Sequence, residues 1–225
     1  MPVNRVRMHC LLVASTAAEI APFTDHLGNT EKLDHIDFDV DILITGVGSN
    51  AATYSLTRYL QHKKPDLVIQ AGVAGAFDPE IKPGTVFVVK QDVLADQGVQ
   101  HKDGFLDVFD LSLAASNELP YKKGVLPNPY SNMLKRTRLK KGIGVTVNEI
   151  TTLKKRSESY VSRYAADLES MEGASLHYVC LMEHIPFLQL RSISNYVTER
   201  NKKKWNLPLA IANLNKELIR LLESL

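Results

Sequence analysis

The chain has 225 residues, of which 44% are hydrophobic and 23% charged, with a formal net charge of +2. This composition is typical of a globular protein and gives no reason to expect nucleic acid or a membrane as partner. The length suits a single domain over residues 1–225. No run approaches the ~20 apolar residues that a membrane-spanning helix needs.

Short apolar runs alternate with longer stretches of helical periodicity, a pattern typical of an α/β fold. In chain order the expected elements are a strand at 9–14, a helix at 17–27, a strand at 41–45, a helix at 50–61, strands at 67–70, 85–89 and 144–147, a helix at 170–183, a strand at 187–193 and a helix at 208–225. Residues 110–141 are rich in Pro, Asn and Lys and receive no assignment.

Cysteine, histidine and lysine placement limits the possible chemistry. Cys10 and Cys180 both lie in apolar runs, which predicts reduced core residues in a cytoplasmic protein. The seven histidines show no metal-ligand spacing, so no metal and no cofactor is expected, and His177 is expected to be a packing residue. The basic clusters at 135–141 and 202–204 lack interleaved aromatic residues and are predicted to be solvated faces rather than nucleic-acid sites.

Two glycine-containing segments follow expected strands. Residues 45–50, Thr-Gly-Val-Gly-Ser-Asn, precede a helix expected from about Ala51, and residues 70–76 follow the strand that ends at Gln70. Glycine permits positive φ and lets a ligand approach main-chain amides. A dinucleotide site is excluded because Ala51 stands at the third glycine position of G-x-G-x-x-G. The segments are predicted to be tight turns that form walls of a pocket.

Glu172 and Asn195 stand out among the polar residues. Glu172 opens a largely apolar helix, where a buried carboxylate is costly unless something binds it. Asn195 follows an apolar strand, and open α/β sheets bind ligands beyond the carboxyl ends of their strands. The pair predicts a site for a polyol and a heterocycle.

Five segments together resemble the nucleoside phosphorylase and nucleosidase superfamily. They are residues 14–19 (Ala-Ser-Thr-Ala-Ala-Glu), 45–48 (Thr-Gly-Val-Gly), 64–76, 171–174 (Met-Glu-Gly-Ala) and 191–195 (Arg-Ser-Ile-Ser-Asn). The resemblance implies a twisted mixed central sheet flanked by helices, a small nucleoside substrate and a homodimer or higher homo-oligomer. Residues 95–107 and 195–211 further resemble the futalosine hydrolases of a menaquinone route. That likeness implies hydrolysis of futalosine to hypoxanthine and dehypoxanthine futalosine.

The resemblance also implies residue roles. Glu172 would bind the ribose hydroxyls near the developing positive charge, Glu19 would activate water, and Asn195 would hydrogen-bond the departing base. The remaining residues expected to contact substrate are Val47, Gly72, Val73, Ala74, Gly75, Glu149, Ile150 and Met171. Phe105 and Phe109 are expected at the 5′ end of the nucleoside, from the same or a neighbouring subunit. Arg200 and residues 202–204 are candidate partners for the benzoate of futalosine.

Two substitutions separate subclasses of the superfamily. Adenine-specific nucleosidases carry Asp where this chain has Asn195, and an amide donor suits the N7 and O6 acceptors of a 6-oxopurine. Hexameric phosphorylases hold phosphate with Arg and Ser, at the positions of Gln70 and Val73. Water is therefore the expected nucleophile, and Arg191, inside a strand, is expected to be structural. A general purine nucleosidase or phosphorylase for inosine-like or 5′-modified adenosine nucleosides, and a catalytically silent nucleoside-binding protein, remain alternatives.

Overall fold

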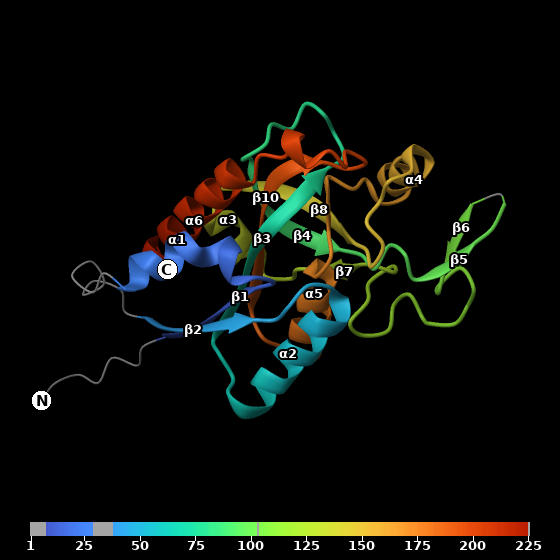
Figure 1. The fold of residues 1–225 in the computed structure, drawn as a ribbon. Helices are drawn as coiled ribbons and strands as arrows, with labels where there is room; N and C mark the ends of the chain where they lie inside the picture. Colours follow the sequence, from blue (N-terminus) through green and yellow to red (C-terminus); the bar gives the residue numbers. More distant parts are fainter. Residues whose placement is uncertain (1–7, 29–37, 103, 225) are drawn as a thin grey trace, which may run out of the picture.

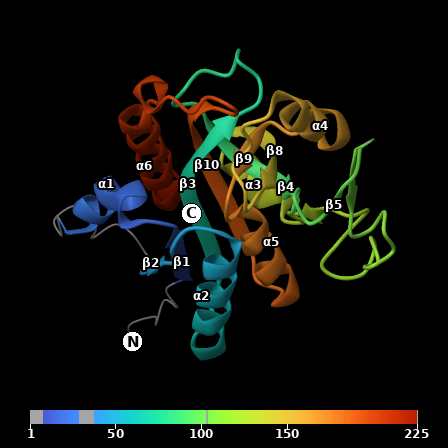
Figure 2. The ribbon, with the colours of Figure 1, turned by 45° about the vertical axis from the view of Figure 1, so that its right-hand side comes forward.

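The computed structural model describes residues 8–28, 38–102 and 104–224, and its fold is drawn in Figures 1 and 2. The elements in chain order are β1 (Met8–Ala14), α1 (Ala17–Gly28), β2 (Phe38–Ile44), α2 (Ser49–His62), β3 (Leu67–Ala76), β4 (Val86–Asp92), β5 (Gly98–Gln100), β6 (Phe105–Asp107), β7 (Leu126–Pro127), α3 (Ser131–Arg136), β8 (Lys140–Thr146), α4 (Lys154–Tyr164), β9 (Leu168–Ser170), α5 (Gly173–Met182), β10 (Phe187–Tyr196), a 3-10 turn at Lys202–Lys204 and α6 (Leu207–Ser224).

The main sheet is mixed and has eight strands, in the order β10-β4-β8-β9-β3-β1-β2, with β7 paired to β4. β10 also pairs with β3, so the strands between them close into a ring. β1, β2, β3 and β10 run parallel to their neighbours in that part of the sheet, whereas β9 is antiparallel to β3. The carboxyl ends of β1, β3 and β10 therefore lie at one edge. The predicted α/β fold with a mixed sheet is confirmed.

Helices cover both faces of the strands β1, β3 and β10 (Figures 1 and 2). Alternate strand residues point to opposite faces, as Leu11 and Leu12 do in β1. Leu12 packs in the core shared with α1 and α6, and Leu11 in the core shared with α2 and α5. Burial on both faces explains why the apolar residues Cys10–Ala14 of β1 and Leu67–Ile69 of β3 follow one another without alternation in the sequence. Each fully buried aliphatic side chain contributes about 1.5–3 kcal/mol.

Several expected boundaries are wrong, and the errors fall around the glycine segments. β3 continues to Ala76, so residues 71–76 are strand and not turn. β10 continues through Asn195 to Tyr196, with a register shift between Ile193 and Asn195. Glycine and polar residues have a low intrinsic preference for β-strand. These stretches are extended because they hydrogen-bond to neighbouring strands.

Other differences concern short elements. The helix expected at 170–183 spans Gly173–Met182, because residues 168–170 form β9 instead. The unassigned stretch 110–141 contains β7, α3 and the first residues of β8. The expectations missed α4 and the β5–β6 hairpin, which projects from the body of the molecule in Figure 1. The last residue of the helix expected at 208–225 lies outside the described part. None of the described helices has the length and apolarity that crossing a membrane requires.

Candidate active site

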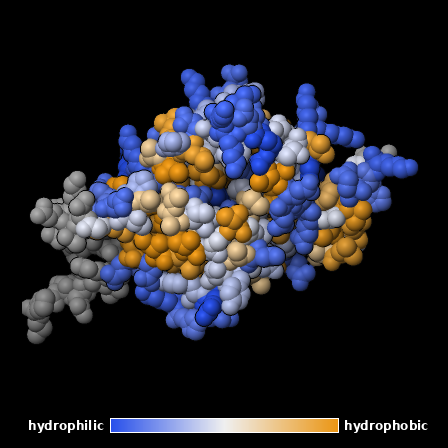
Figure 3. Space-filling view, in the orientation of Figure 1, coloured by the Kyte–Doolittle hydropathy of each residue, from blue (hydrophilic) through white to orange (hydrophobic). Residues whose placement is uncertain are grey.

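A pocket of about 360 Å³ lies at the edge where β1, β3 and β10 end. It has the size of a small-molecule site. Figure 3 shows a hollow near the centre of the face drawn in Figure 1, with hydrophobic surface beside it. The pocket is lined by Ser15, Thr16, Ala18, Glu19, Val47, Val73, Ala74, Gly75, Ile150, Thr151, Glu169, Ser170, Met171, Glu172, Ser194, Asn195, Val197, Thr198, Glu199, Arg200, Trp205, Leu207 and Ile211.

Glu19 lies in the first turn of α1, immediately after β1. One carboxylate oxygen, Oε2, accepts hydrogen bonds from the backbone N–H and the hydroxyl of Thr16, at 3.0 and 3.2 Å. The other, Oε1, accepts from the backbone N–H of Val73 in β3, at 3.1 Å. These donors hold the carboxylate against β3. Glu19 is 9% exposed and reaches the pocket.

Glu172 occupies the position immediately before α5 and is 4% exposed. Its Oε1 accepts a hydrogen bond from the backbone N–H of Gly48, at 3.0 Å. Gly48 adopts φ 96°, which L-residues rarely do, and this conformation belongs to the turn before α2. The glycine turn predicted at 45–50 therefore serves to present an N–H group to Glu172. A carboxylate has about four lone-pair positions, so Glu172 retains acceptor capacity toward the pocket.

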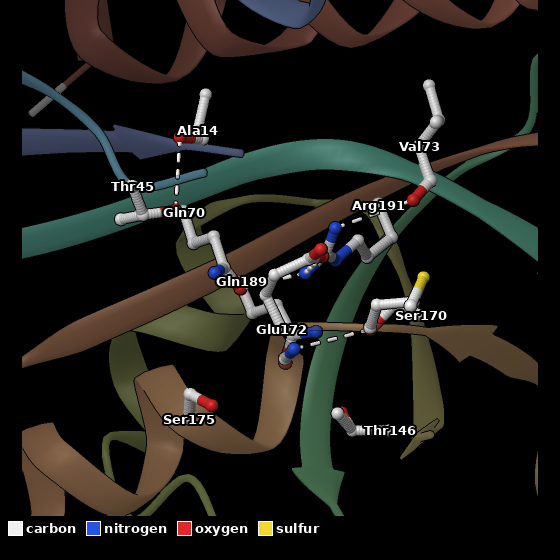
Figure 4. Close-up of polar contacts among 12 residues, drawn as sticks. Ala14, Thr45, Gln70, Val73, Thr146, Ser170, Glu172, Ser175, Gln189 and Arg191 are labelled. Atoms are coloured by element: carbon white, nitrogen blue, oxygen red, sulfur yellow. Dashed lines mark hydrogen bonds and ion pairs between the residues drawn. The ribbon is translucent and has the colours of Figure 1, made fainter. Parts of the chain in front are cut away.

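Arg191 extends from β10 beneath the pocket and is 1% exposed (Figure 4). Its Nη2 donates to Oε1 of Gln70 at 3.0 Å and lies 3.5 Å from Oε2 of Glu172. Its Nη1 donates to the carbonyl oxygen of Val73 at 3.4 Å. Arg191 does lie within the strand, as expected, but it also fixes the second oxygen of Glu172. This pairing could not be predicted from the sequence, because the two residues meet only through the packing of α5 against the sheet.

A buried polar cluster supports the start of α5. Asp92 Oδ1 accepts from the hydroxyl of Thr146 at 2.9 Å, and its Oδ2 accepts from the Gln189 amide at 3.1 Å. The hydroxyl of Thr146 in turn accepts from the backbone N–H of Ala174 in the first turn of α5, at 2.8 Å. Complete burial raises the pKa of Asp92 to about 6. A Cβ at Gly173 would lie 2.2 Å from Asp92 Oδ2, so glycine is needed next to Glu172.

Asn195 lies near the end of β10 and lines the same pocket. Its Oδ1 accepts from the hydroxyl of Ser194 at 2.7 Å, and its Nδ2 donates to the carbonyl oxygen of Tyr196 at 3.0 Å. The amide is thereby oriented, and one N–H of the Nδ2 group remains for a ligand. A Cβ at Gly75 would lie 3.3 Å from Nδ2, which makes a small residue at this position useful.

The structure brings most of the predicted site residues together. Glu19, Glu172 and Asn195 line one pocket, as do Val47, Val73, Ala74, Gly75, Ile150 and Met171. Gly72 and Glu149 are not in the lining, contrary to expectation. Gly72 lies behind it, next to Arg191, and Glu149 is turned away. The Glu149 side chain pairs with Arg156 at 3.1 Å, and its backbone N–H donates to Asp96.

Residues that were not predicted complete the pocket. Glu169 from β9 is the clearest case: its Oε1 accepts from the backbone N–H of Thr151 at 3.1 Å, and burial raises its pKa. Trp205 from the segment between β10 and α6 adds apolar surface, as do Leu207 and Ile211 from α6. Phe105 and Phe109 do not line this pocket. Among the described residues no group of three or more His, Cys, Asp or Glu side chains could hold a metal ion.

We expect Gly72→Ala to lower activity about 100-fold. A Cβ there would lie 2.4 Å from Nη1 of Arg191 and 3.0 Å from Oε1 of Glu19, so both groups must move. Displacing positioned groups by about 1 Å costs on the order of 100-fold, and overpacking costs about 1–3 kcal/mol of stability. Steady-state kinetics and urea unfolding measure the two effects. Gly28→Ala, where a Cβ meets nothing within 4 Å, is the matched control; equal activity of both variants would contradict the expectation.

Comparison with known proteins places this fold and pocket in a family. The model of the phosphorylase superfamily matches residues 39–223. The chain therefore belongs to the phosphorylase superfamily.

Two curated relatives and one solved structure illustrate the likeness. The chain is 31% identical to the futalosine hydrolase of Streptomyces coelicolor, over 77% of this chain and 74% of the relative. It is 22% identical to the 5′-methylthioadenosine/S-adenosylhomocysteine nucleosidase of Tolumonas auensis, over 95% and 98%. The native structure of futalosine hydrolase of Helicobacter pylori superposes with a TM-score of 0.79 at 18% identity, covering 99% and 100%. The expected enzyme class, an N-glycosyl hydrolase, is confirmed by these relatives.

Proposed function

We propose that this enzyme hydrolyses the N-ribosidic bond of futalosine, releasing hypoxanthine and dehypoxanthine futalosine as a step toward menaquinone. The observation that carries the proposal is the Asn195 carboxamide in the pocket that also contains Glu19 and Glu172. Its free N–H can donate to N7 or O6 of a 6-oxopurine, both of which are acceptors. The futalosine hydrolase of Streptomyces coelicolor, at 31% identity, supports the same substrate.

The roles of the two carboxylates follow from the needs of the reaction. As the bond between C1′ and the purine nitrogen breaks, its electrons move to the base and the ribosyl group gains positive charge. Glu172 accepts hydrogen bonds from the ribose hydroxyls and stabilises that charge. Glu19 removes a proton from the water that bonds to C1′. Asn195 donates to the base, and this hydrogen bond strengthens as negative charge accumulates there.

Water as the nucleophile is supported by Gln70 and Val73. Gln70 is 1% exposed, and its Oε1 is engaged by Arg191 rather than presented to the pocket. The backbone N–H of Val73 is already bonded to Glu19, and its side chain has no hydroxyl. These positions offer a phosphate dianion neither a guanidinium nor a hydroxyl group.

Release of hypoxanthine from futalosine in phosphate-free buffer tests the proposal. We expect spectrophotometric turnover that is unchanged when phosphate is added. A strict requirement for phosphate, or no cleavage of futalosine by enzyme that cleaves inosine, would overturn it.

Cleavage of 5′-modified adenosine nucleosides is the second candidate, because the Tolumonas auensis nucleosidase matches nearly the whole chain. Rates on futalosine, 6-aminofutalosine, inosine and methylthioadenosine separate the two. The proposal expects futalosine to be preferred to methylthioadenosine, and a preference for the latter would favour the second candidate.

Asn195→Asp is expected to reduce kcat/KM for futalosine about 100-fold, since removing one preorganised donor costs about 3 kcal/mol of transition-state stabilisation. The carboxyl group can supply a proton to N7 of a 6-aminopurine, so the rate on 6-aminofutalosine should fall less or rise. Competition between the two substrates measures the change in preference. An unaltered ratio would place base selection elsewhere in the pocket.

The same proposal covers domain organisation, oligomeric state and cellular compartment. Residues 1–225 would form one domain that works as a homodimer or higher homo-oligomer in the cytoplasm, without metal or cofactor. The free, buried thiols of Cys10 and Cys180 support a reducing compartment. Phe105 and Phe109, which do not line the pocket of their own chain, would complete a neighbouring site.

A further inference from the structure

One wall of the pocket is formed by the segment that connects β10 to α6. Val197, Thr198, Glu199, Arg200 and Trp205 from this segment all line the pocket. None of them contributes to the steps assigned to Glu19, Glu172 and Asn195. This wall is therefore available for a part of the substrate beyond the sugar and the base.

Hydrogen bonds hold the segment in one conformation. The backbone N–H of Asn206 donates to the carbonyl oxygen of Ser194 at 2.8 Å, which ties the end of the segment to β10. The side chain of Asn201 accepts from the backbone N–H of Lys203 at 3.1 Å. The indole N–H of Trp205 donates to the carbonyl oxygen of Glu199 at 2.9 Å and fixes the ring.

Arg200 lies on this fixed ring. Its guanidinium carbon is 5.3 Å from the centroid of the Trp205 ring, within the range of a cation–π contact. The contact limits the positions that the long side chain visits. None of the described residues accepts a hydrogen bond from the guanidinium or forms an ion pair with it. Its five N–H donors thus remain for a ligand or solvent.

The neighbouring lysines differ from Arg200 in position, and one of them also differs in its partner. Residues 202–204 do not line the pocket. Lys204 is paired with Glu199 at 2.6 Å, so its charge is already matched. Of the candidate cations named from the sequence, only Arg200 both reaches the pocket and lacks a carboxylate partner.

Arg200 is the cation of a pocket whose other charged side chains are carboxylates. Four glutamates line it (Glu19, Glu169, Glu172 and Glu199), and among the described lining residues Arg200 is the only cationic side chain. Arg191, the nearest buried cation, is engaged by Glu172 and Gln70. Because Lys204 and Arg191 are already paired with Glu199 and Glu172, Arg200 is the cation in the pocket lining that is left to attract an anionic substituent of a substrate.

We propose that Arg200 and Trp205 form the subsite for an aromatic carboxylate carried at the 5′ end of the nucleoside. The planar guanidinium pairs with the carboxylate in a bidentate geometry that lysine cannot reproduce. The aromatic ring packs beside Trp205, against the apolar side chains of Leu207 and Ile211. The assignment rests on the proposed function, because the benzoate of futalosine is such a group.

The test compares three substrates with wild-type enzyme and Arg200→Ala. Futalosine carries the carboxylate, its methyl ester keeps the ring without the charge, and inosine lacks both. We expect Arg200→Ala to raise KM for futalosine about tenfold at low ionic strength, with kcat changed less than about twofold, as for loss of one charge-assisted pair. KM for the ester and for inosine should stay within about twofold. Arg200→Lys should fall between the two enzymes on futalosine.

Lys203→Ala is the matched control, since it removes the same charge from the same segment outside the pocket. It should leave KM for futalosine unchanged. Raising the salt to 1 M, where the Debye length is about 3 Å, should shrink the difference between wild type and Arg200→Ala.

The outcomes separate this proposal from the proposed function. If wild type cleaves futalosine and Arg200→Ala has the same KM, or a KM raised equally on all three substrates, the subsite is overturned and the function stands. If wild type cleaves inosine or methylthioadenosine but not futalosine, the proposed function fails and the subsite fails with it. A charge-selective rise in KM supports both.

Discussion

Glu19→Gln is expected to slow hydrolysis of futalosine by about 10²–10⁴-fold, the range for losing a positioned general base. An amide of the same shape has no basic oxygen to accept the proton from water. Substrate affinity should change little, because the role proposed for Glu19 concerns the water and not the base or the ribose. Single-turnover kinetics separate the chemical step from binding.

The hydrogen bonds around Glu19 predict that Glu19→Gln also lowers the stability of the protein. Both of its oxygens accept hydrogen bonds from main-chain N–H groups, those of Thr16 and Val73. An amide NH2 must face one of these donors, which leaves it unsatisfied and costs about 1–3 kcal/mol of stability. Glu158→Gln on the exposed face of α4 is the control and should behave as wild type. Turnover of Glu19→Gln within a few-fold of wild type would exclude the base role.

Glu172→Gln is expected to lower kcat/KM by about 10³-fold, equivalent to about 4 kcal/mol of lost transition-state stabilisation. The neutral amide cannot stabilise a positively charged ribosyl group. It also leaves Arg191 buried opposite an uncharged partner, 3.5 Å away in the native pair. Breaking a buried pair from one side costs about 3–5 kcal/mol, so denaturant unfolding should show a large loss.

A double variant separates stability from chemistry at this position. Replacing Arg191 by Met in the Glu172→Gln background removes the uncompensated charge and should recover part of the lost stability. Activity should not recover, because the carboxylate is still absent. Recovery of activity together with stability would mean that Glu172 acts only by keeping the protein folded.

The main strands and helices could be predicted because their signals are local. β1 and β10 contain runs of apolar residues, and α2 has an amphipathic pattern. Burying such apolar side chains stabilises the fold whichever element they pack against. Short elements gave no such signal: β9 and the β5–β6 hairpin have three residues per strand. β9 is a strand only through its pairing with β3 and β8, and β5 and β6 only through their pairing with each other.

The site was partly predictable for a related reason. Glu19, Glu172 and Asn195 are marked by their positions at the ends of apolar elements and by the motifs around them, although their catalytic roles stay predictions. The direction of the Glu149 side chain could not be predicted, because its partner Arg156 is brought next to it only by α4. Arg191 was underestimated because its partner is known only once α5 is packed.

By itself, the sequence determined the order of the main strands and helices and the types of chemical group available. Those properties follow from residue spacing and hydrophobicity, which act over a few residues. Only the tertiary structure decided that Arg191 joins Glu172, that Gly48 donates to Glu172, and that Arg200 faces the pocket while the lysines after it do not. Such contacts join residues far apart in the chain or depend on the direction of one side chain, so their energies exist only after the sheet and helices have packed.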